Sequence, residues 1–343
     1  MTRGQRVFHF SPLDLTQTGG VEMHINRLVS ECPAFGWPAS AGLEPQQDFW
    51  ADGGPRLLHS HGDRIPPWRL IERFGMRSWV HTLHGTSSGR ALACHELFGL
   101  RNYLSAAKEA LPCWFAAGII CVSPAVHEQA RRHFAMPSWR HFSVIPNGAD
   151  NPSGDGALYA AYKPYVLFLG RGDDRVKNAQ GLIAAWQKTR MTNPSAHLLV
   201  APSRGFPKDE ERIVAFDTIT IREKSSLISG AAAVVIPSFY EADSIVAWEA
   251  MAHGTPVIAS ASIGVRPFLE RYGAHTFIEP RNETALAAAL ASALAPSAVA
   301  RTTPLLRSWS DVAKETTVFY ATLSKTVIAA TADPFVALYG VGI

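Results

Sequence analysis

The stretch VVIPSFYEADSIVAWEAMAHGTPVIAS, residues 234–260, decides the fold of this 343-residue chain. It opens with a short apolar run that ends in Pro-Ser at residues 237–238, which is typical of a buried parallel strand. Helix-compatible residues follow until the Gly-Thr-Pro of residues 254–256, where the helix ends before a second apolar run at residues 257–260. This order of strand, helix and strand indicates an α/β layer with a parallel sheet.

Two glutamates eight residues apart, Glu241 and Glu249, lie in this stretch. The pattern places Glu241 on the loop after the strand and Glu249 inside the helix. Counted as helical steps, the separation is about 12 Å with a turn of about 800°, which would put both carboxylates near one face. Carboxylates accept paired hydrogen bonds from neighbouring hydroxyls, so the spacing suits a long ligand with a sugar at one end and a ribose at the other. Two ordinary helix-surface carboxylates are the alternative.

Two cations follow another apolar run. After the strand pattern of residues 166–169, the segment GRGDDRVKN places Arg171 and Lys177 six residues apart on a strand-to-helix loop. Fixed cations there can hold a diphosphate, and they stabilise the negative charge that develops as a nucleoside diphosphate leaves. Two surface cations on a polar loop are the alternative.

A glycine pair, Gly19 and Gly20, separates the first strand pattern, residues 7–10, from a helical pattern. Because glycine has no Cβ atom, the pair lets backbone amides approach a phosphate or a sugar closely. A loop turn that binds nothing is the alternative. The chain lacks the Gly-x-Gly-x-x-Gly string of dinucleotide-binding oxidoreductases.

Together these segments resemble the retaining glycosyltransferases of the GT4 type, whose signature is a glutamate, seven residues, a second glutamate and then Ala-Met-Ala-x-Gly-Thr-Pro-Val. Further matching segments occur in the order of that family and cover the chain nearly end to end. They are GGVE at 19–22, HTLHG at 81–85, VS at 122–123, VIPNG at 144–148, FLGR at 168–171, KN at 177–178 and SWS at 308–310.

The resemblance implies an α/β chain with the GT-B fold, in which two Rossmann-like domains with parallel sheets face each other across a cleft. We expect residues 1–150 to form the acceptor-side domain. Residues 151–162 have the composition of a linker, with proline, glycine and serine at their start. Residues 163–323 would bind the nucleotide sugar, and the resemblance implies that residues 324–343 cross back onto the first domain.

The same resemblance implies a hexosyltransferase that retains the configuration of the transferred sugar. The acceptor hydroxyl would attack from the face that the diphosphate leaves, with a phosphate oxygen as the base, and neither a metal ion nor a cofactor would be required. The catalytic residues that it implies are His84, Arg171, Lys177 and Glu241. The donor-binding residues that it implies are Gly19, Gly20, Arg171, Lys177, Ala242, Asp243, Ser244, Ile245 and Glu249.

The loop Ala242-Asp243-Ser244 departs from the Gly-Phe-Gly or Ser-Phe-Gly that usually follows the first glutamate in that family. Asp243 either binds a hydroxyl or caps the helix, and we favour the cap. The donor sugar is therefore left open. The base of a UDP or GDP donor should lie near residues 219–224, where nothing separates uracil from guanine.

Several histidines occur close together, as His59-Ser60-His61 and as His81-x-x-His84. Neither pattern carries the glutamate or the cysteine pair of a common zinc motif, so we predict no metal site. The resemblance places His84 beside the donor sugar. We expect His61 to be a structural histidine at a strand end.

The net charge is +3, and its clearest concentration of cations is residues 64–79, RIPPWRLIERFGMRSW. A helix there would gather Arg69, Arg73 and Arg77 on one side, beside Trp68, as a face for an anionic membrane or a phosphorylated acceptor. A solvated outer helix is the alternative. Binding of nucleic acid is not expected, because no reader motif accompanies the charge.

The compartment is predicted from the cysteines and the chain start. Four cysteines without Cys-x-x-Cys spacing suit a reducing compartment. The first apolar stretch is too short for a signal-peptide core. We therefore expect a cytoplasmic protein, peripheral at most on the inner face of the membrane.

The leading function is transfer of a sugar to a glycan, glycolipid or small-molecule hydroxyl, as in polysaccharide or lipopolysaccharide biosynthesis. An inactive subunit of the same fold that binds a carbohydrate or a partner is one alternative. A nucleotide-sugar epimerase or hydrolase is another, with His61, Asp63 and Asp243 as its acid or base candidates. Transfer needs an added acceptor, whereas hydrolysis and epimerisation do not.

Overall fold

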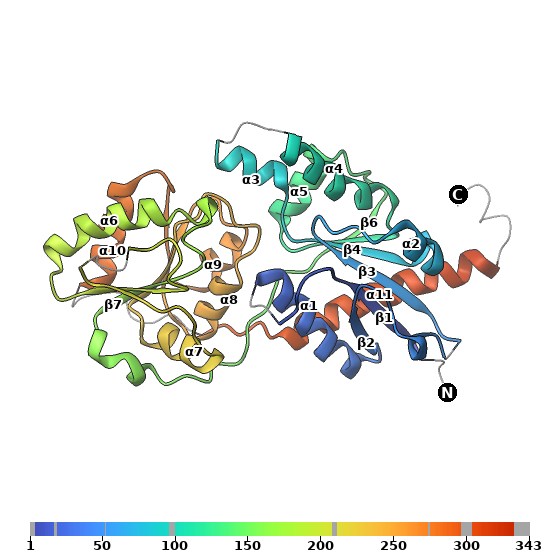
Figure 1. The fold of residues 1–343 in the computed structure, drawn as a ribbon, viewed down its shortest axis with the longest axis horizontal. Coiled ribbons are helices and arrows are strands. Elements are labelled where there is room, and N and C mark those ends of the chain that lie inside the picture. Colours follow the sequence, from blue (N-terminus) through green and yellow to red (C-terminus); the bar gives the residue numbers. More distant parts are fainter. Residues whose placement is uncertain are drawn as a thin grey trace. The chain divides into compact units, whose positions relative to one another are not determined.

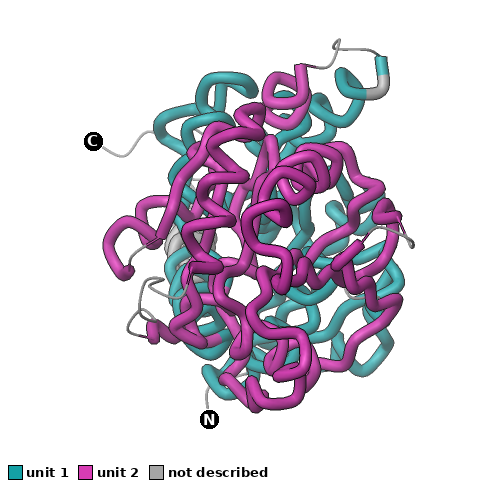
Figure 2. Tube along the Cα trace, turned by 90° about the vertical axis from the view of Figure 1, so that its left-hand side faces the viewer, with its two compact units in different colours: residues 1–88, 97–147, 309–343 teal, residues 89–96, 148–308 magenta. Residues whose placement is uncertain are grey.

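The computed structural model describes residues 4–16, 19–51, 53–95, 100–207, 211–273, 275–295 and 304–332. The chain divides into two compact units (Figure 2). Unit 1 comprises residues 1–88, 97–147 and 309–343, and unit 2 comprises residues 89–96 and 148–308. None of the described helices is both long enough and apolar enough to cross a bilayer.

Unit 1 is built on a parallel six-stranded sheet in the order β2-β1-β3-β4-β5-β6. Its strands are β1 Arg6–Phe10, β2 Ala39–Gly42, β3 Arg56–His61, β4 Trp79–Leu83, β5 Gly118–Cys121 and β6 His141–Val144. Its helices are α1 Gly20–Glu31, α2 Trp68–Phe74, α4 Leu100–Phe115, α5 Pro124–His133 and α11 Trp309–Ala332, and α3 Ser87–Ala93 begins in this unit (Figure 1). Strand β2 pairs on one side of β1, and β3 then pairs on the other side. The direction in which successive strands are added to the sheet therefore changes between β1 and β3, and we call this place the direction change of the sheet.

Unit 2 also has a parallel six-stranded sheet, in the order β12-β11-β10-β7-β8-β9. Its strands are β7 Tyr165–Leu169, β8 His197–Ala201, β9 Ile213–Ala215, β10 Ala233–Ile236, β11 Val257–Ser260 and β12 Thr276–Ile278. Its helices are α6 Ala179–Thr192, α7 Ile221–Gly230, α8 Ile245–Ala252, α9 Arg266–Tyr272 and α10 Glu283–Leu294. Counted from β7, this is the strand order of the Rossmann fold, and the chain changes direction between β7 and β10.

Both faces of the unit 2 sheet are covered because its strands are apolar on both sides, as a buried parallel sheet requires. On one face, Leu167 and Val234 pack with Trp248 of α8. On the other face, Val166 and Trp186 of α6 lie in a second core cluster. The two parallel sheets with helical layers confirm the α/β fold class drawn from the sequence.

The unit boundaries differ from those expected. The first crossing lies after Asn147, and the return crossing lies at Trp309 rather than at residue 324. Both crossings occur side by side, because the Ala149 N–H donates to the Arg307 carbonyl at 2.8 Å. Residues 333–343, the end of the expected crossing segment, lie outside the described residues.

Two further segments depart from expectation. The expected linker contains a short 3-10 helix, residues 156–162, that packs on α7 and belongs to unit 2. Residues 89–96 of the expected first domain also belong to unit 2. Polar contacts explain this, because the Ala93 carbonyl accepts from Arg281 at 2.8 Å.

The basic aromatic segment 64–79 does not form one helix. Only residues 68–74 are α-helical, and Gly75, with a φ of +83°, interrupts the segment before a 3-10 turn. The arginines are also engaged: Arg69 pairs with Glu44, and the Arg73 guanidinium lies 4.1 Å from the centre of the Trp50 ring. The expected single basic face is therefore absent from this segment.

Candidate functional site

The direction change in the unit 2 sheet carries an ion pair between two predicted residues. Lys177 follows β7 and Glu241 follows β10, and the Lys177 Nζ lies 2.6 Å from the Glu241 Oε1. The Ser238 hydroxyl donates to the same carboxylate oxygen at 2.9 Å. In open α/β sheets, loops diverge where the strand order reverses, and ligands bind there at the carboxyl ends of the strands.

The two loops that carry this pair are tied together by backbone and amide hydrogen bonds. Asn178 has a left-handed φ of +56°, and its Nδ2 donates to the carbonyls of Pro237 at 3.1 Å and Pro280 at 2.8 Å. The Phe239 N–H donates to the Val176 carbonyl at 2.8 Å. The positions of the lysine and the carboxylate are therefore set by the backbone as well as by their mutual attraction.

Arg171 lies on the same loop as Lys177 but has a different partner. Its Nη2 is 3.2 Å from Asp174 Oδ2, and its side chain is 63% exposed. The other Asp174 oxygen is 3.1 Å from Arg90 Nη2, which makes Arg90 a third cation at this loop. No sequence pattern pointed to Arg90, because it lies 81 residues away in the chain from Arg171.

Glu249 lies inside α8, as predicted, but it is buried and paired. Its side chain is 6% exposed and forms an ion pair with Lys224 of α7, which is 19% exposed. Glu241 precedes the helix, so the estimate of eight helical steps does not describe the two glutamates. The structure instead gives each glutamate its own lysine. Lys224 ends the segment where the base was expected.

The loop between the glutamates starts α8 differently from expectation. Ser244, not Asp243, is the N-cap residue, and its Oγ accepts from the Ala247 N–H at 3.4 Å. Asp243 accepts from the Trp248 indole N–H at 3.0 Å. The indole lies one turn into the helix, so it draws the carboxylate away from the cap position. Ala242 is buried, and Ile245 is the first helical residue.

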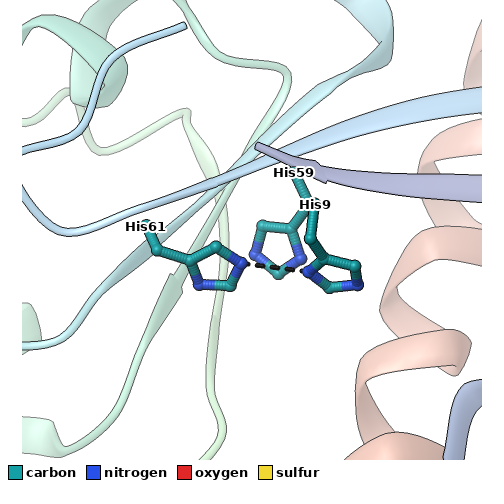
Figure 3. A group of neighbouring side chains, drawn as sticks. All are labelled: His9, His59 and His61. Carbon is teal, nitrogen blue, oxygen red and sulfur yellow. Dashed lines mark hydrogen bonds between the residues drawn. The ribbon is translucent and has the colours of Figure 1, made fainter. Parts of the chain in front are cut away.

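At the direction change of the unit 1 sheet, the polar side chains are histidines rather than an ion pair. His9 is the next-to-last residue of β1 and His61 is the last residue of β3. The His9 Nδ1 lies 3.0 Å from the His61 Nε2. Figure 3 shows the two rings turned toward each other, with a dashed line between them. The other His61 nitrogen, Nδ1, lies 3.2 Å from the Nε2 of the predicted residue His84. These rings form a chain from the buried sheet to the half-buried His84.

Further polar groups support this chain. The His24 Nδ1 lies 2.8 Å from Asn147 Oδ1, and its ring meets the His84 ring edge-on at 4.6 Å. The His59 nitrogens lie 2.6 Å from the Tyr320 hydroxyl and 2.7 Å from the Thr82 hydroxyl. The sequence showed these histidines separately, but only the parallel pairing of the strands places them together.

Burial keeps these histidines neutral. It lowers the pKa of His9 to about 3 and the pKa of His24 to about 4. Burial, followed by the repulsion of neighbouring histidines, also lowers the pKa of His59, His61 and His84 well below the usual range. The cluster therefore offers hydrogen bonds without charge at neutral pH.

Among the described residues, two groups of three histidines have ring nitrogens within 4.8 Å of one another: His9, His59 and His61, and His24, His61 and His84. Neutral imidazoles are metal ligands, so both groups have suitable atoms. Both nitrogens of His59 already have hydroxyl partners, however, and His61 has a histidine on each side. Hydrogen bonding accounts for these contacts, and the lack of a metal site stays a prediction.

Gly19 and Gly20 begin α1, which starts beside the end of β1. Gly19 is the N-cap residue, and no side chain caps the helix. A Cβ atom at Gly19 would lie 2.1 Å from Glu22 Oε2, so the glutamate carboxylate occupies the space over this glycine. The glycine pair and His84 belong to unit 1, whereas the lysines and glutamates belong to unit 2.

Comparison with known proteins identifies relatives of this chain. Residues 163–295 match the family described as Glycosyl transferases group 1. Glycogen synthase of Mycobacterium tuberculosis is 27% identical over 267 residues, which is 72% of this chain and 62% of the relative. An uncharacterised glycosyltransferase of Methanocaldococcus jannaschii is 28% identical over 61% of this chain and 58% of the relative. The matches thus span less than two thirds of the length of these curated relatives.

Solved structures share the fold over nearly the whole chain. Sucrose-phosphate synthase from Thermosynechococcus elongatus has a TM-score of 0.74 with 22% identity, and the match covers 94% of this chain and all of that one. Anabaena HepE in complex with UDP-glucose has a TM-score of 0.63 with 14% identity, covering 94% and 99%. These matches confirm the GT-B fold class, and the family match confirms the resemblance that the sequence motifs indicated.

Proposed function

We propose that this chain, whose residues 163–295 match the family described as Glycosyl transferases group 1, is a retaining glycosyltransferase that uses a nucleotide-diphosphate sugar. The observation that carries the proposal is the Lys177–Glu241 pair at the direction change between β7 and β10. A cation and a carboxylate side by side match a donor in which a phosphate is bonded directly to a hydroxyl-rich ring.

Donor binding would exchange the partners of this pair. The Lys177 ammonium would turn to the diphosphate, and the Glu241 carboxylate would accept hydrogen bonds from sugar hydroxyls. As the bond from the anomeric carbon to the phosphate oxygen breaks, negative charge grows on the diphosphate, so Lys177 stabilises the transition state more than the bound donor. Arg171 would add a second cation by leaving Asp174, to which Arg90 also bonds.

The nucleoside end would lie at Glu249 and Lys224. A carboxylate accepts two hydrogen bonds from the neighbouring ribose hydroxyls. Lys224 holds Glu249 in place until then. The amides from Ala242 to Ile245, at the start of α8, would face the diphosphate. UDP is the first donor class to test, because Anabaena HepE is seen in complex with UDP-glucose, and GDP is the second.

In unit 1, His84 would donate a hydrogen bond to the sugar. Within the part of the chain that the structure describes, the buried Nε2 of His9 has no hydrogen-bond partner, and an unpaired lone pair costs less there than an unpaired N–H. Protons therefore point from His9 to His61 and from His61 to His84, which leaves the His84 Nδ1 with its proton as a donor. Gly19 and Gly20 would present backbone amides to the donor after the Glu22 carboxylate leaves the space over Gly19.

The acceptor hydroxyl would attack from the face that the diphosphate leaves, with a phosphate oxygen taking its proton. This retains configuration and needs no nucleophilic side chain. We propose that the cations and helix amides perform the charge stabilisation without a metal ion or cofactor. The proposed acceptor is a glycan or lipid-linked glycan of the lipopolysaccharide kind, used by a cytoplasmic enzyme.

Saturation-transfer NMR of the purified protein against UDP-, GDP- and ADP-sugars tests the proposal. Glu241→Gln and Glu249→Gln remove one charge each and keep the side-chain shape. Glu283→Gln is the matched control, because Glu283 forms an exposed ion pair with Lys188 in the same unit. We expect one donor class to bind to the protein and to the control, with weaker binding to both test variants. Equal binding to all variants, or no binding to any donor, would contradict the proposal and favour an inactive subunit.

Addition of an acceptor then separates the enzyme classes. A transferase releases nucleoside diphosphate from the bound donor only when an acceptor hydroxyl is present. Release at the same rate without an acceptor would identify a hydrolase, and conversion of the donor to another nucleotide sugar would identify an epimerase.

A further inference from the structure

The outward face of α4 is apolar, although an outward helix face in a water-soluble domain is usually polar. Six large side chains on this helix are between 40% and 75% exposed: Leu100, Tyr103, Leu104, Leu111, Trp114 and Phe115. We call these six residues the α4 face. Their spacing of three and four residues places them on one side of a helix about 24 Å long. The opposite side, with Glu109 and Cys113, is buried toward β4 and β5.

Two more aromatic residues continue the apolar surface beyond the end of α4. Trp139 and Phe142 are 70% and 43% exposed. Arg140 joins Trp139 to the end of α4, because its guanidinium lies 4.5 Å from the centre of the Trp139 ring and its Nη1 donates to the Ala116 carbonyl at 2.5 Å. The Phe142 ring stacks on His127 of α5 at 3.9 Å. The Trp114 indole donates to the Phe134 carbonyl at 3.0 Å, so α4 and the end of α5 also adjoin.

The segment that carries this surface has more basic than acidic residues. Of 32 basic and 29 acidic residues, five basic and two acidic ones lie in residues 100–142, which leaves 27 of each sign elsewhere. One of the two acids, Glu109, is buried on the other side of α4. Lys108, Arg131 and Arg132 are exposed at the surface, and Arg132 pairs with Glu128 at 2.6 Å. This segment thus has a net charge of +3 and also carries the exposed apolar side chains.

We propose that the α4 face docks on the surface of an anionic lipid bilayer. Tryptophan and tyrosine favour the boundary between headgroups and acyl chains, and leucines on the same helix face can enter that boundary. Arginine and lysine stems lie along apolar surface while their charged ends reach anionic headgroups. A second copy of the chain is less suitable, because it would bring two positive surfaces together. The proposal does not depend on the proposed transfer reaction, and it places the membrane contact on α4 rather than on residues 64–79.

Sedimentation with lipid vesicles tests this proposal. The full chain is mixed with vesicles of phosphatidylcholine alone or of phosphatidylcholine with phosphatidylglycerol, at low and at high salt. Leu104→Gln with Leu111→Gln removes apolar contact, and Arg131→Gln with Arg132→Gln removes two charges. The matched control is Trp68→Gln with Arg69→Gln, a surface aromatic and a surface cation on α2 of the same unit.

We expect binding only to the anionic vesicles, reduced by salt. Each test pair should weaken it, the arginine pair by roughly 30-fold at low salt, since each surface cation contributes about a fivefold gain. The α2 control should bind like the unaltered chain. Absence of vesicle binding, or loss of binding in the control alone, would overturn the proposal. So would a dimer in light scattering that Leu104→Gln with Leu111→Gln dissociates, because the α4 face would then join two copies of the chain.

Discussion

At the direction change of the unit 1 sheet the polar side chains are neutral histidines, whereas at that of unit 2 they are lysines and glutamates in ion pairs. The backbone is arranged in the same way at both places: two parallel strands are neighbours, and the loops that follow them diverge. What differs is the residue type at the strand ends. A neutral cluster can bind hydroxyl groups, and an ionic cluster can hold a charged group and respond when its charge grows. Under the proposed function, charge stabilisation would therefore be the role of the ionic cluster of unit 2.

Lys177→Met is expected to have the largest effect, because it removes the cation of the ionic cluster. Removal of one preorganised charge or donor at a developing negative charge lowers kcat by about 100- to 1000-fold. Lys188→Met is the matched control, since Lys188 pairs with Glu283 at an exposed site where an ion pair contributes little. Steady-state kinetics with the donor identified by NMR would measure both. A Lys177→Met enzyme as fast as the control would break the proposed division between the two units.

Acidification should destabilise unit 1 through its neutral histidines. Burial puts the folded-state pKa of His9 at about 3, below its ordinary value of 6.5, so the unfolded chain binds protons first as pH falls. The free energy of unfolding therefore keeps its full value above pH 6.5 and decreases below it, by roughly 2 kcal/mol per such histidine at pH 5. His24, His59, His61, His81 and His84 shift in the same direction.

Hydrogen exchange, corrected for the intrinsic effect of pH, would measure this in each unit separately. Amides of β1 and β3 should lose more protection between pH 7 and pH 5 than amides of β7 and β10. His9→Gln should reduce the loss by the share of one histidine. An equal loss of protection in both sheets would contradict the contrast between the neutral histidines of unit 1 and the ion pairs of unit 2.

Ser244→Ala should have the smallest effect, because it removes only the cap of α8 beside the ionic cluster. Loss of a serine N-cap lowers the free energy of unfolding by about 1 kcal/mol. Asp243→Asn is the comparison, since its amide oxygen can still accept from the Trp248 indole. Urea unfolding followed by tryptophan fluorescence would measure both. A larger loss for Asp243→Asn than for Ser244→Ala would restore Asp243 as the residue that holds the start of the helix.

Much of the local structure could be predicted from short patterns. The strand patterns of residues 166–169 and 257–260 and the placement of Glu249 inside a helix agree with β7, β11 and α8. These predictions depend on apolar runs and breakers within one stretch of chain. The segment 64–79 failed for the same local reason, because the spacing of its arginines predicted one face while Gly75 ends the helix after Phe74. The unit boundary at Trp309 could not be predicted from composition, because it depends on the pairing of Ala149 with the distant Arg307.

The sequence by itself determined the α/β class, the strand-end loops that carry Arg171, Lys177 and Glu241, and the family resemblance. Each of these features depends on residues that are close together in the chain. Only the tertiary structure decided the partners: Lys177 with Glu241, Lys224 with Glu249, and the chain of His9, His61 and His84. The physical reason is that parallel strands far apart in sequence pair in an order that no local pattern specifies. That order determines which strand ends meet, and hence which charges and hydrogen bonds act together.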